Sequence, residues 1–357
     1  MYYQYKKQFQ QALVEWYKRE KRDLPWRRTC DPYKIWVSEV MLQQTRVDTV
    51  IPYYERFLSE FPTLQHLADA EEEKLLKQWE GLGYYSRARN LQAGVREVVE
   101  NYNSLVPDNR SEISKLKGVG PYTAGAVLSI AYNKAEHAVD GNVMRVLSRV
   151  LLIEEDIALP KTKKTFENAV MELIDPMHPS EFNQGLMELG ATICTPTSPK
   201  CLLCPVREFC TAFNEGQPEN LPIKTKKVKM KHIPYDVFVI KNTIGQFLVE
   251  KRPAKGLLAN MWQFPMVEQV GNADTTNETK LAEQYNLNLL SREKLTSFKH
   301  IFSHLTWHIE SYSIGCEEQA KLPGNCQWFT AEEMANLPMP VPMQKVWQSY
   351  KIETTSL

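Results

Sequence analysis

The sequence predicts a multidomain protein with an all-α first part and an α+β second part. Two observations predict this division. Apolar residues recur with helical spacing up to about residue 215, and short runs of β-branched and aromatic residues replace them after residue 232. The chain has 357 residues, enough for two or three domains that each bury a core. We expect a helical domain over 1–215, a basic linker over 216–232 and an α+β domain over 233–350.

Apolar side chains in the first part follow one face of a helix. Close to the N-terminus this face consists of Phe9, Ala12, Leu13, Trp16 and Tyr17. The same spacing recurs between residues 88 and 102 and between residues 143 and 151. Because no stretch of the first part alternates convincingly with a period of two residues, the sequence predicts helices throughout it.

Short alternating runs in the second part predict strands. The expected strands are 236–240, 246–251, 262–267, 305–314 and 327–329. In 305–314 the alternation slips between Ile309 and Tyr312, which indicates a β-bulge. Thr330 and Glu333 have the spacing of a capping box, so a helix should begin after the last strand.

Charge and hydropathy limit the class of protein. Basic and acidic residues number 43 each, so the net charge identifies no partner and any nucleic-acid surface must be a local patch. Five lysines lie within 224–231, where they are either solvated or in contact with phosphate. No apolar run reaches the length of a membrane span, and the first thirty residues lack a signal-peptide core. We therefore expect a cytoplasmic protein, with a monomer as the default state.

Four cysteines are crowded into 17 residues with the spacing C-x6-C-x2-C-x5-C. They are Cys194, Cys201, Cys204 and Cys210. Four close thiols in a reducing compartment predict a metal centre. Zinc sites usually pair two C-x2-C motifs, whereas here one pair is flanked by single cysteines without a histidine. The spacing favours a [4Fe–4S] cluster over zinc, with disulfides third, and a purely structural role is compatible with it.

A glycine hairpin, 116-LKGVGPYTAGAVLSI-130, separates two helical segments. Gly118 and Gly120 allow backbone conformations and close approaches that side chains forbid. Backbone N–H groups at the following helix N-terminus can then bind a DNA phosphate, although a corner in any helical bundle can use the same residues. Asp140 follows about twenty residues later, at a position where it can cap a helix and stay ionised.

The order of these motifs resembles the endonuclease III-like, helix-hairpin-helix DNA glycosylases. The earlier segment 24-LPWRRTCDPYKIWVSEVMLQQTRVDTV-50 resembles their MutY-type adenine DNA glycosylase branch, and the resemblance covers essentially the whole chain. It implies an enzyme of base excision repair that acts on double-stranded DNA, is associated with the nucleoid and carries a [4Fe–4S] cluster. The implied reaction flips out and removes adenine mispaired with 8-oxoguanine or guanine.

Hydrolysis of an N-glycosyl bond requires a proton for the departing base and stabilisation of the sugar cation. Glu39 lies among apolar neighbours, which would bury its carboxyl and raise its pKa. The resemblance makes Glu39 the proton donor and later the group that activates water, and it places Asp140 against the sugar cation. Tyr122 and Asn142 match residues that position the acids and water. The residues alone favour an exposed helix glutamate without a role at Glu39, because most glutamates are exposed, and a helix cap at Asp140.

Tyr122 stands where the bifunctional relatives carry the lysine that attacks the sugar, so the resemblance implies a glycosylase without lyase activity. Met144 stands where some relatives carry a lysine that traps the product.

The resemblance also implies a set of DNA contacts. Trp26 and Arg27 would line the adenine pocket, and Gln184 falls where some relatives carry a glutamate that reads adenine. The base must be unstacked and the gap that it leaves in the duplex must be filled, and the residues implied in these steps are Leu42, Gln44, Thr45 and Tyr84.

The second part resembles a Nudix domain, a fold whose hydrolases hold magnesium with a glutamate-rich R-E-x-x-E-E helix. The corresponding segment, 268–290, lacks this motif, so we expect a domain that reads DNA without catalysis. The resemblance implies that Phe302, Ser303 and His304 contact 8-oxoguanine. An ordinary loop before a strand is the alternative for these three residues.

Three other functions remain open from the sequence. A bifunctional or thymine/uracil glycosylase is disfavoured by Tyr122 and by the added domain. A Nudix nucleotide hydrolase is disfavoured by the missing acidic helix. A non-enzymatic iron–sulfur protein that binds DNA or transfers electrons would lack a base-release activity that depends on Glu39.

Overall fold

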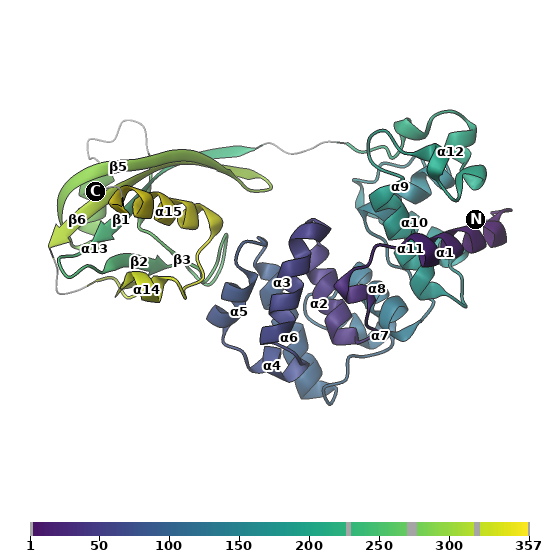
Figure 1. Ribbon diagram of the computed structural model, residues 1–357, viewed down its shortest axis with the longest axis horizontal. Coiled ribbons are helices and arrows are strands. Elements are labelled where there is room, and N and C mark those ends of the chain that lie inside the picture. Colours follow the sequence, from purple (N-terminus) through teal and green to yellow (C-terminus); the bar gives the residue numbers. More distant parts are fainter. Residues whose placement is uncertain (1–2, 226–229, 270–276, 318–321, 356–357) are drawn as a thin grey trace. The chain divides into compact units, whose positions relative to one another are not determined.

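The computed structural model of the protein describes residues 3–225, 230–269, 277–317 and 322–355 (Figure 1). The chain divides into two compact units, which we call the helical unit and the sheet unit. The helical unit contains Met1–Asp69 and Ser86–Lys226, and the sheet unit contains Ala70–Tyr85 and Lys227–Leu357. The short segment 70–85 therefore groups with the sheet unit although it interrupts the sequence of the helical unit.

The helical unit is all-α over its described residues, as the sequence predicts. Its long helices are α1 (Lys6–Glu20), α2 (Pro32–Leu42), α3 (Val47–Glu60), α6 (Ser86–Asn101), α8 (Pro121–Tyr132), α9 (Gly141–Val150), α10 (Pro160–Leu173) and α11 (Pro179–Thr192). Its short elements are η1 (Pro25–Arg27), α4 (Leu64–Asp69), α7 (Arg110–Ile113), η2 (Cys201–Leu203), η3 (Arg207–Phe209), α12 (Thr211–Asn214) and η4 (Pro218–Asn220). Among all described residues, none of the helices is long and apolar enough to cross a membrane.

The apolar face predicted near the N-terminus forms part of a core. Phe9, Leu13 and Tyr17 of α1 are buried together with Val143 and Leu147 of α9. The same core extends to side chains of α10, α11 and the cysteine loop. The helix that carries Asp140 at its start is therefore fixed by packing along its length.

A close approach at Gly125 brings the backbone that leads to Asp140 against α8. A Cβ atom at this position would lie 1.7 Å from the carbonyl oxygen of His137, so any larger residue would displace the segment. Because α8 also packs against α2, this contact places the ends of three elements around one space.

The sheet unit has α+β architecture, which confirms the predicted fold class. Its elements are α5 (Glu72–Trp79), β1 (Lys231–Lys241), β2 (Phe247–Lys251), β3 (Trp262–Gln263), β4 (Met266–Glu268), α13 (Asn277–Tyr285), β5 (Asn288–Ile301), β6 (Leu305–Glu317), β7 (Cys326–Phe329), α14 (Ala331–Met334) and α15 (Val341–Thr355). The described residues form a seven-stranded sheet with the central order β3-β2-β1-β6-β5, in which β4 also pairs with β1 and β7 with β2. The pairing of β1 with β6 is parallel, and the other pairs are antiparallel.

Helices cover both faces of this sheet. Leu248 of β2 packs in a core with Leu281 of α13. The preceding Phe247 stacks edge-on against Trp347 of α15, which lies along the sheet in yellow in Figure 1. Since consecutive residues of a strand point to opposite faces, α13 and α15 lie on opposite sides.

The strand predictions hold in part. The capping box of Thr330 and Glu333 is present. The expected bulge lies opposite Ser311 and Tyr312, but the extra residue belongs to β5. Two predictions are wrong. The expected strand 262–267 is interrupted at Phe264 and Pro265, because proline has no N–H for the ladder. The sequence analysis also missed β5, whose many charged residues hide the alternation. The expected linker includes residues 226–229, which lie outside the described residues.

Candidate active site

A cavity of about 900 Å³ in the helical unit lies among α2, α8, α11 and the start of α9. Most of the residues expected to act on DNA line it. They are Trp26, Arg27, Glu39, Leu42, Gln44, Thr45, Gly118, Gly120, Tyr122, Asp140, Asn142 and Gln184. The structure thus brings together residues that are up to 158 positions apart in the sequence, between Trp26 and Gln184.

Glu39 is buried in the wall of this cavity, with 5% of its surface exposed. Its Oε2 atom accepts a hydrogen bond of 2.5 Å from the Tyr122 hydroxyl. Burial, together with the nearby Asp140, raises the pKa of Glu39 to about 7 against the opposing effects of Tyr122 and Arg27. The burial and the raised pKa expected from its apolar neighbours are confirmed. At neutral pH this carboxyl exists in both the protonated and the ionised form.

Tyr122 lies in the first turn of α8, directly after the glycine hairpin. Burial and the neighbouring carboxyls of Glu39 and Asp140 raise the pKa of its phenol well above 10. Its hydroxyl therefore stays neutral and donates to Glu39. The sulfur of Met187 lies 3.8 Å from the same hydroxyl.

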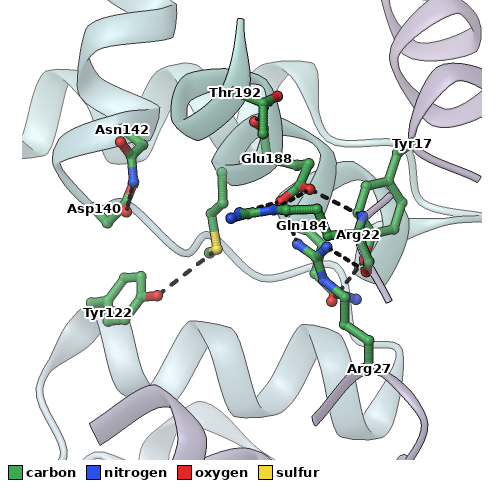
Figure 2. Close-up of polar contacts among 10 residues, drawn as sticks. Tyr17, Arg22, Arg27, Tyr122, Asp140, Asn142, Gln184, Glu188 and Thr192 are labelled. Carbon is green, nitrogen blue, oxygen red and sulfur yellow. Dashed lines mark hydrogen bonds and ion pairs between the residues drawn. The ribbon is translucent and has the colours of Figure 1, made fainter. Parts of the chain in front are cut away.

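Asp140 caps the N-terminus of α9, as the sequence predicts. Its Oδ1 atom accepts from the backbone N–H of Val143 at 2.7 Å, and its Oδ2 atom accepts from Asn142 Nδ2 at 2.9 Å (Figure 2). Burial nevertheless raises the pKa of Asp140 above its ordinary value, against the effect of these hydrogen bonds. The predicted cap is present, and its hydrogen bonds favour the ionised carboxylate against the effect of burial.

The two hairpin glycines differ in backbone conformation and in the space around them. Gly118 has a φ of +77°, and a Cβ atom there would lie 2.7 Å from Asn90 Cβ. Gly120 has an ordinary φ of −86° and is the N-cap of α8. A Cβ atom on Gly120 would meet no atom within 4 Å, so this residue faces open space. The hairpin thus leaves the N-terminus of α8 accessible to an anion.

The loop after α2 is held by an arginine that the sequence analysis missed. Arg87 Nη1 donates to the carbonyl oxygens of Val40 and Met41, each at 3.0 Å, and to that of Gln43 at 2.5 Å. The next residue, Gln44, has a φ of +57°. Arg87 is hard to recognise in the sequence because a second arginine, Arg89, lies two residues away in 86-SRARN-90.

The sequence analysis also missed Arg22 and Glu188, which line the cavity together with Arg27. Arg22 belongs to a run of charged residues, 18-KREKRD-23, in which nothing distinguishes it. The available signal for Glu188 was its spacing, since it follows Gln184 by one helical turn on α11. Gln184 itself is engaged at both ends: it accepts from the Tyr17 hydroxyl at 2.9 Å and donates to Ser180 at 3.1 Å.

The four clustered cysteines line a second, small cavity and are all free thiols. Among the described residues, no three side chains of His, Cys, Asp or Glu are arranged to hold a single metal ion. Thiols spread around a cavity fit a larger group, and Arg149 donates to Cys194 Sγ at 3.2 Å, which suits a thiolate. The donor set therefore fits an iron–sulfur cluster better than zinc.

The remaining expected DNA contacts belong to the sheet unit. Residues 302–304 form the hairpin between β5 and β6, where Ser303 and His304 are exposed. Phe302 packs edge-on against His300 and Trp307, with ring centroids 4.6 and 4.9 Å apart. Tyr84 is exposed, and its hydroxyl forms a hydrogen bond with that of Ser303.

Three family models match separate parts of the chain. Residues 37–176 match an HhH-GPD superfamily base excision DNA repair protein, residues 194–210 match the iron-sulfur binding domain of endonuclease III, and residues 236–349 match a NUDIX domain. The solved structure of a thermostable thymine-DNA glycosylase superposes with a TM-score of 0.54 at 30% identity, covering 59% of this chain and 97% of that one. Fold and site together define a base-excision DNA glycosylase, an enzyme that hydrolyses N-glycosyl bonds.

Two curated relatives narrow this class. The adenine DNA glycosylase of Mus musculus is 36% identical over 400 residues, covering 96% of this chain and 78% of the mouse protein. The adenine DNA glycosylase of Buchnera aphidicola subsp. Schizaphis graminum is 35% identical over 355 residues, covering 96% and 99%. The chain belongs to the adenine DNA glycosylase family. It carries a [4Fe–4S] cluster, which Cys194, Cys201, Cys204 and Cys210 would hold.

Proposed function

We propose that this enzyme removes adenine from double-stranded DNA where adenine is mispaired with 8-oxoguanine or guanine. The names of the relatives support adenine as the base. The observation that carries the mechanism is the pair of carboxyls in one cavity, Glu39 and Asp140, whose different surroundings suit different tasks.

Glu39 acts as the general acid. Its protonated carboxyl donates a proton to N7 of the flipped adenine while the bond between the base and C1′ of the sugar breaks. The electron pair of that bond leaves with the base, and positive charge develops on the sugar. Ionised Glu39 then accepts a proton from water as the water oxygen bonds to C1′. Because its pKa is about 7, the carboxyl can both give and take a proton at neutral pH.

Asp140 stabilises the sugar cation by its charge. Asn142 and the N-terminus of α9 fix its orientation through hydrogen bonds to both carboxylate oxygens. Tyr122 fixes Glu39 in the same way. The hairpin backbone at Gly118 and Gly120 binds phosphate next to the flipped nucleotide.

Base release proceeds without strand cleavage, because a tyrosine occupies the helix position from which related lyases use a lysine amine. Among the described residues that line the cavity, Lys163 supplies the single lysine, and it lies on α10 rather than on the hairpin helix. Recognition of 8-oxoguanine involves the exposed Ser303 and His304 of the sheet unit.

The deciding experiment is single-turnover cleavage of a duplex with one 8-oxoguanine·adenine pair, quenched in parallel with alkali and at neutral pH. We expect strand breaks only after alkali, because the product is an abasic site. Breaks at neutral pH would contradict hydrolysis without lyase activity, and Lys163→Gln would then show whether this amine is responsible. Absence of breaks under both conditions would contradict adenine as the base.

Glu39→Gln tests the general acid directly. We expect base release to fall by at least about 10²-fold, the usual contribution of such a group, while duplex binding in a gel-shift assay is retained. Glu172→Gln is the matched control, since Glu172 pairs with Lys6 on the surface of the helical unit. Undiminished release by the Glu39 variant would refute the assignment.

A further inference from the structure

Glu188 is the centre of a buried group of charges in the cavity wall. Its side chain is 1% exposed. Oε1 accepts from Arg22 Nε at 2.8 Å and from the Arg22 backbone N–H at 3.2 Å. Oε2 accepts from Arg22 Nη2 at 2.8 Å and from Arg27 Nη2 at 2.7 Å. Figure 2 shows both guanidinium groups converging on this one carboxylate.

Arg27 is held from three directions. Apart from its ion pair with Glu188, its Nη1 donates to the Arg22 carbonyl oxygen at 3.1 Å, and its guanidinium lies over the Tyr17 ring at 5.3 Å. The Arg27 side chain is 9% exposed, whereas that of Arg22 is 39% exposed. Arg22 therefore reaches solvent, and Arg27 places its charge inside the cavity that also contains Glu39.

We propose that Glu188 is a positioning residue of the active site, which holds Arg27 in the cavity wall and offsets its charge so that Arg27 does not pair with Glu39. This inference rests on the proposed role of Glu39 as the general acid. No general acid can work while it is locked in an ion pair with a guanidinium, because it then stays ionised.

The charged surroundings of Glu39 support this arrangement. Tyr122 from α8 and Asp140 at the start of α9 face it, and Arg27 is the cation that lowers its pKa. Arg87 from α6 is engaged with carbonyls of α2, and Arg46 before α3 lines the same cavity.

Glu188 keeps its own charge at every relevant pH. Burial raises the pKa of its carboxyl, but hydrogen bonds from Arg22 and Arg27 outweigh burial and lower the pKa to about 2. Its negative charge is therefore constant. If it is removed, the charge of Arg27 is no longer offset, the ionised form of Glu39 becomes more favourable, and the pKa of Glu39 falls.

The test is the pH dependence of single-turnover adenine release by the full-length protein with Glu188→Gln, which keeps the shape and an acceptor but removes the charge. Release requires protonated Glu39, so the rate declines as pH rises through its pKa. We expect the midpoint of this decline to move about one unit lower, with about tenfold slower release at pH 8 and a nearly unchanged rate at pH 5. A rate that falls equally at all pH values, with an unmoved midpoint, would overturn the proposal.

A double variant, Glu188→Gln with Arg27→Gln, tests the route of the effect. Removal of both charges should return the midpoint to the wild-type position or above it, even if the maximal rate is low. A midpoint that stays shifted would show that Arg27 is not the mediator.

Two further variants serve as controls for this experiment. Thermal melting and cluster absorbance show whether Glu188→Gln folds. If it does not, Glu188→Asp replaces it: this variant keeps the charge, so the midpoint of the pH profile should stay in place. A shifted midpoint in Glu188→Asp would contradict the positioning role. Glu39→Gln separates this inference from the function it rests on. Active Glu39→Gln enzyme would refute the general acid itself, whereas an inactive one with no shift in Glu188→Gln would refute the positioning role alone.

Discussion

The buried carboxyl of Glu39 should make the protein less stable at alkaline pH. Its pKa is about 7 in the folded chain, against an ordinary value of 4.5. A group whose pKa is raised by folding favours the folded state fully below the lower value and loses that contribution as pH rises through the higher one. The difference corresponds to about 3 kcal/mol at most at pH 8.

We therefore predict that Glu39→Gln melts at a higher temperature than the wild type at pH 8, while the difference shrinks or reverses at pH 5. Differential scanning calorimetry at the two pH values measures this. A Glu39→Gln variant that is as stable as the wild type at pH 8, or less stable, would show that the pKa of Glu39 is not raised. The catalytic group would then carry no stability cost.

Removal of the Tyr122 hydroxyl should act in the opposite direction to the Glu188 variant. The hydrogen bond from Tyr122 lowers the pKa of Glu39, so Tyr122→Phe should raise it. We expect the alkaline decline of adenine release to move up by about one unit, since a hydrogen bond to a charged group contributes about 1.5–3 kcal/mol. A pH profile that moves down or does not move would contradict the contact.

Single residues of the site were predictable from the sequence only where a motif fixed them. Asp140 was expected because it follows the hairpin by about twenty residues, and Glu39 because it lies among apolar residues in the segment 24–50 that resembles MutY-type enzymes. Glu188 and Arg87 were not, because nothing in their neighbouring residues shows that a fold will bury their charges against α2 and η1. Their roles depend on partners that are 44 to 166 positions distant in the sequence.

At the scale of elements, the position of the C-terminus of α2 should depend most on Arg87. Its guanidinium holds three carbonyl oxygens that have no partner inside the helix. Lysine keeps the charge but cannot match the planar fork. We predict that Arg87→Lys slows adenine release from a duplex by about 10- to 100-fold, because the following loop loses its position.

A duplex with 2-aminopurine next to the mispair measures this loss as weaker fluorescence from base flipping. Arg89→Lys, in the same helix α6, is the control. Normal flipping by the Arg87 variant would show that the loop holds its position without it.

Two features of the sheet were not predictable from the sequence. In β5 three charged residues, 292–294, follow one another, and the pairing with β6 has two register irregularities, so little periodicity remains. The break between β3 and β4 lies at Phe264 and Pro265, where the Pro265 carbonyl still accepts from Phe238 N–H at 2.9 Å. Helices with a buried face, such as α1 and α9, were predictable because packing itself imposes their pattern.

At the scale of the whole molecule, selectivity for the base opposite adenine should be separable from chemistry. The proposed catalytic residues belong to the helical unit, and the exposed hairpin of Ser303 belongs to the sheet unit. We predict that Ser303→Ala reduces the preference for 8-oxoguanine·adenine over guanine·adenine by about five- to tenfold, the effect of about 1 kcal/mol for one hydrogen bond.

Single-turnover rates on the two duplexes measure this preference. Ser297→Ala, an exposed serine earlier on β5, is the control. An equal loss on both duplexes would assign Ser303 a general role in DNA binding.

The division of the sheet unit between 70–85 and 227–357 has a consequence for synthesis on the ribosome. The first segment of the sheet unit, which contains α5, ends at Tyr85, and the second segment begins 142 residues later at Lys227. At about 5–20 residues per second this is a delay of about 7–30 s. During that time Glu72 lacks its contact with Asn260, and Glu73 lacks its contacts with Lys251 and Trp262, because these three residues have not been made. The nascent chain must keep this helix soluble until the last third of the protein has been translated.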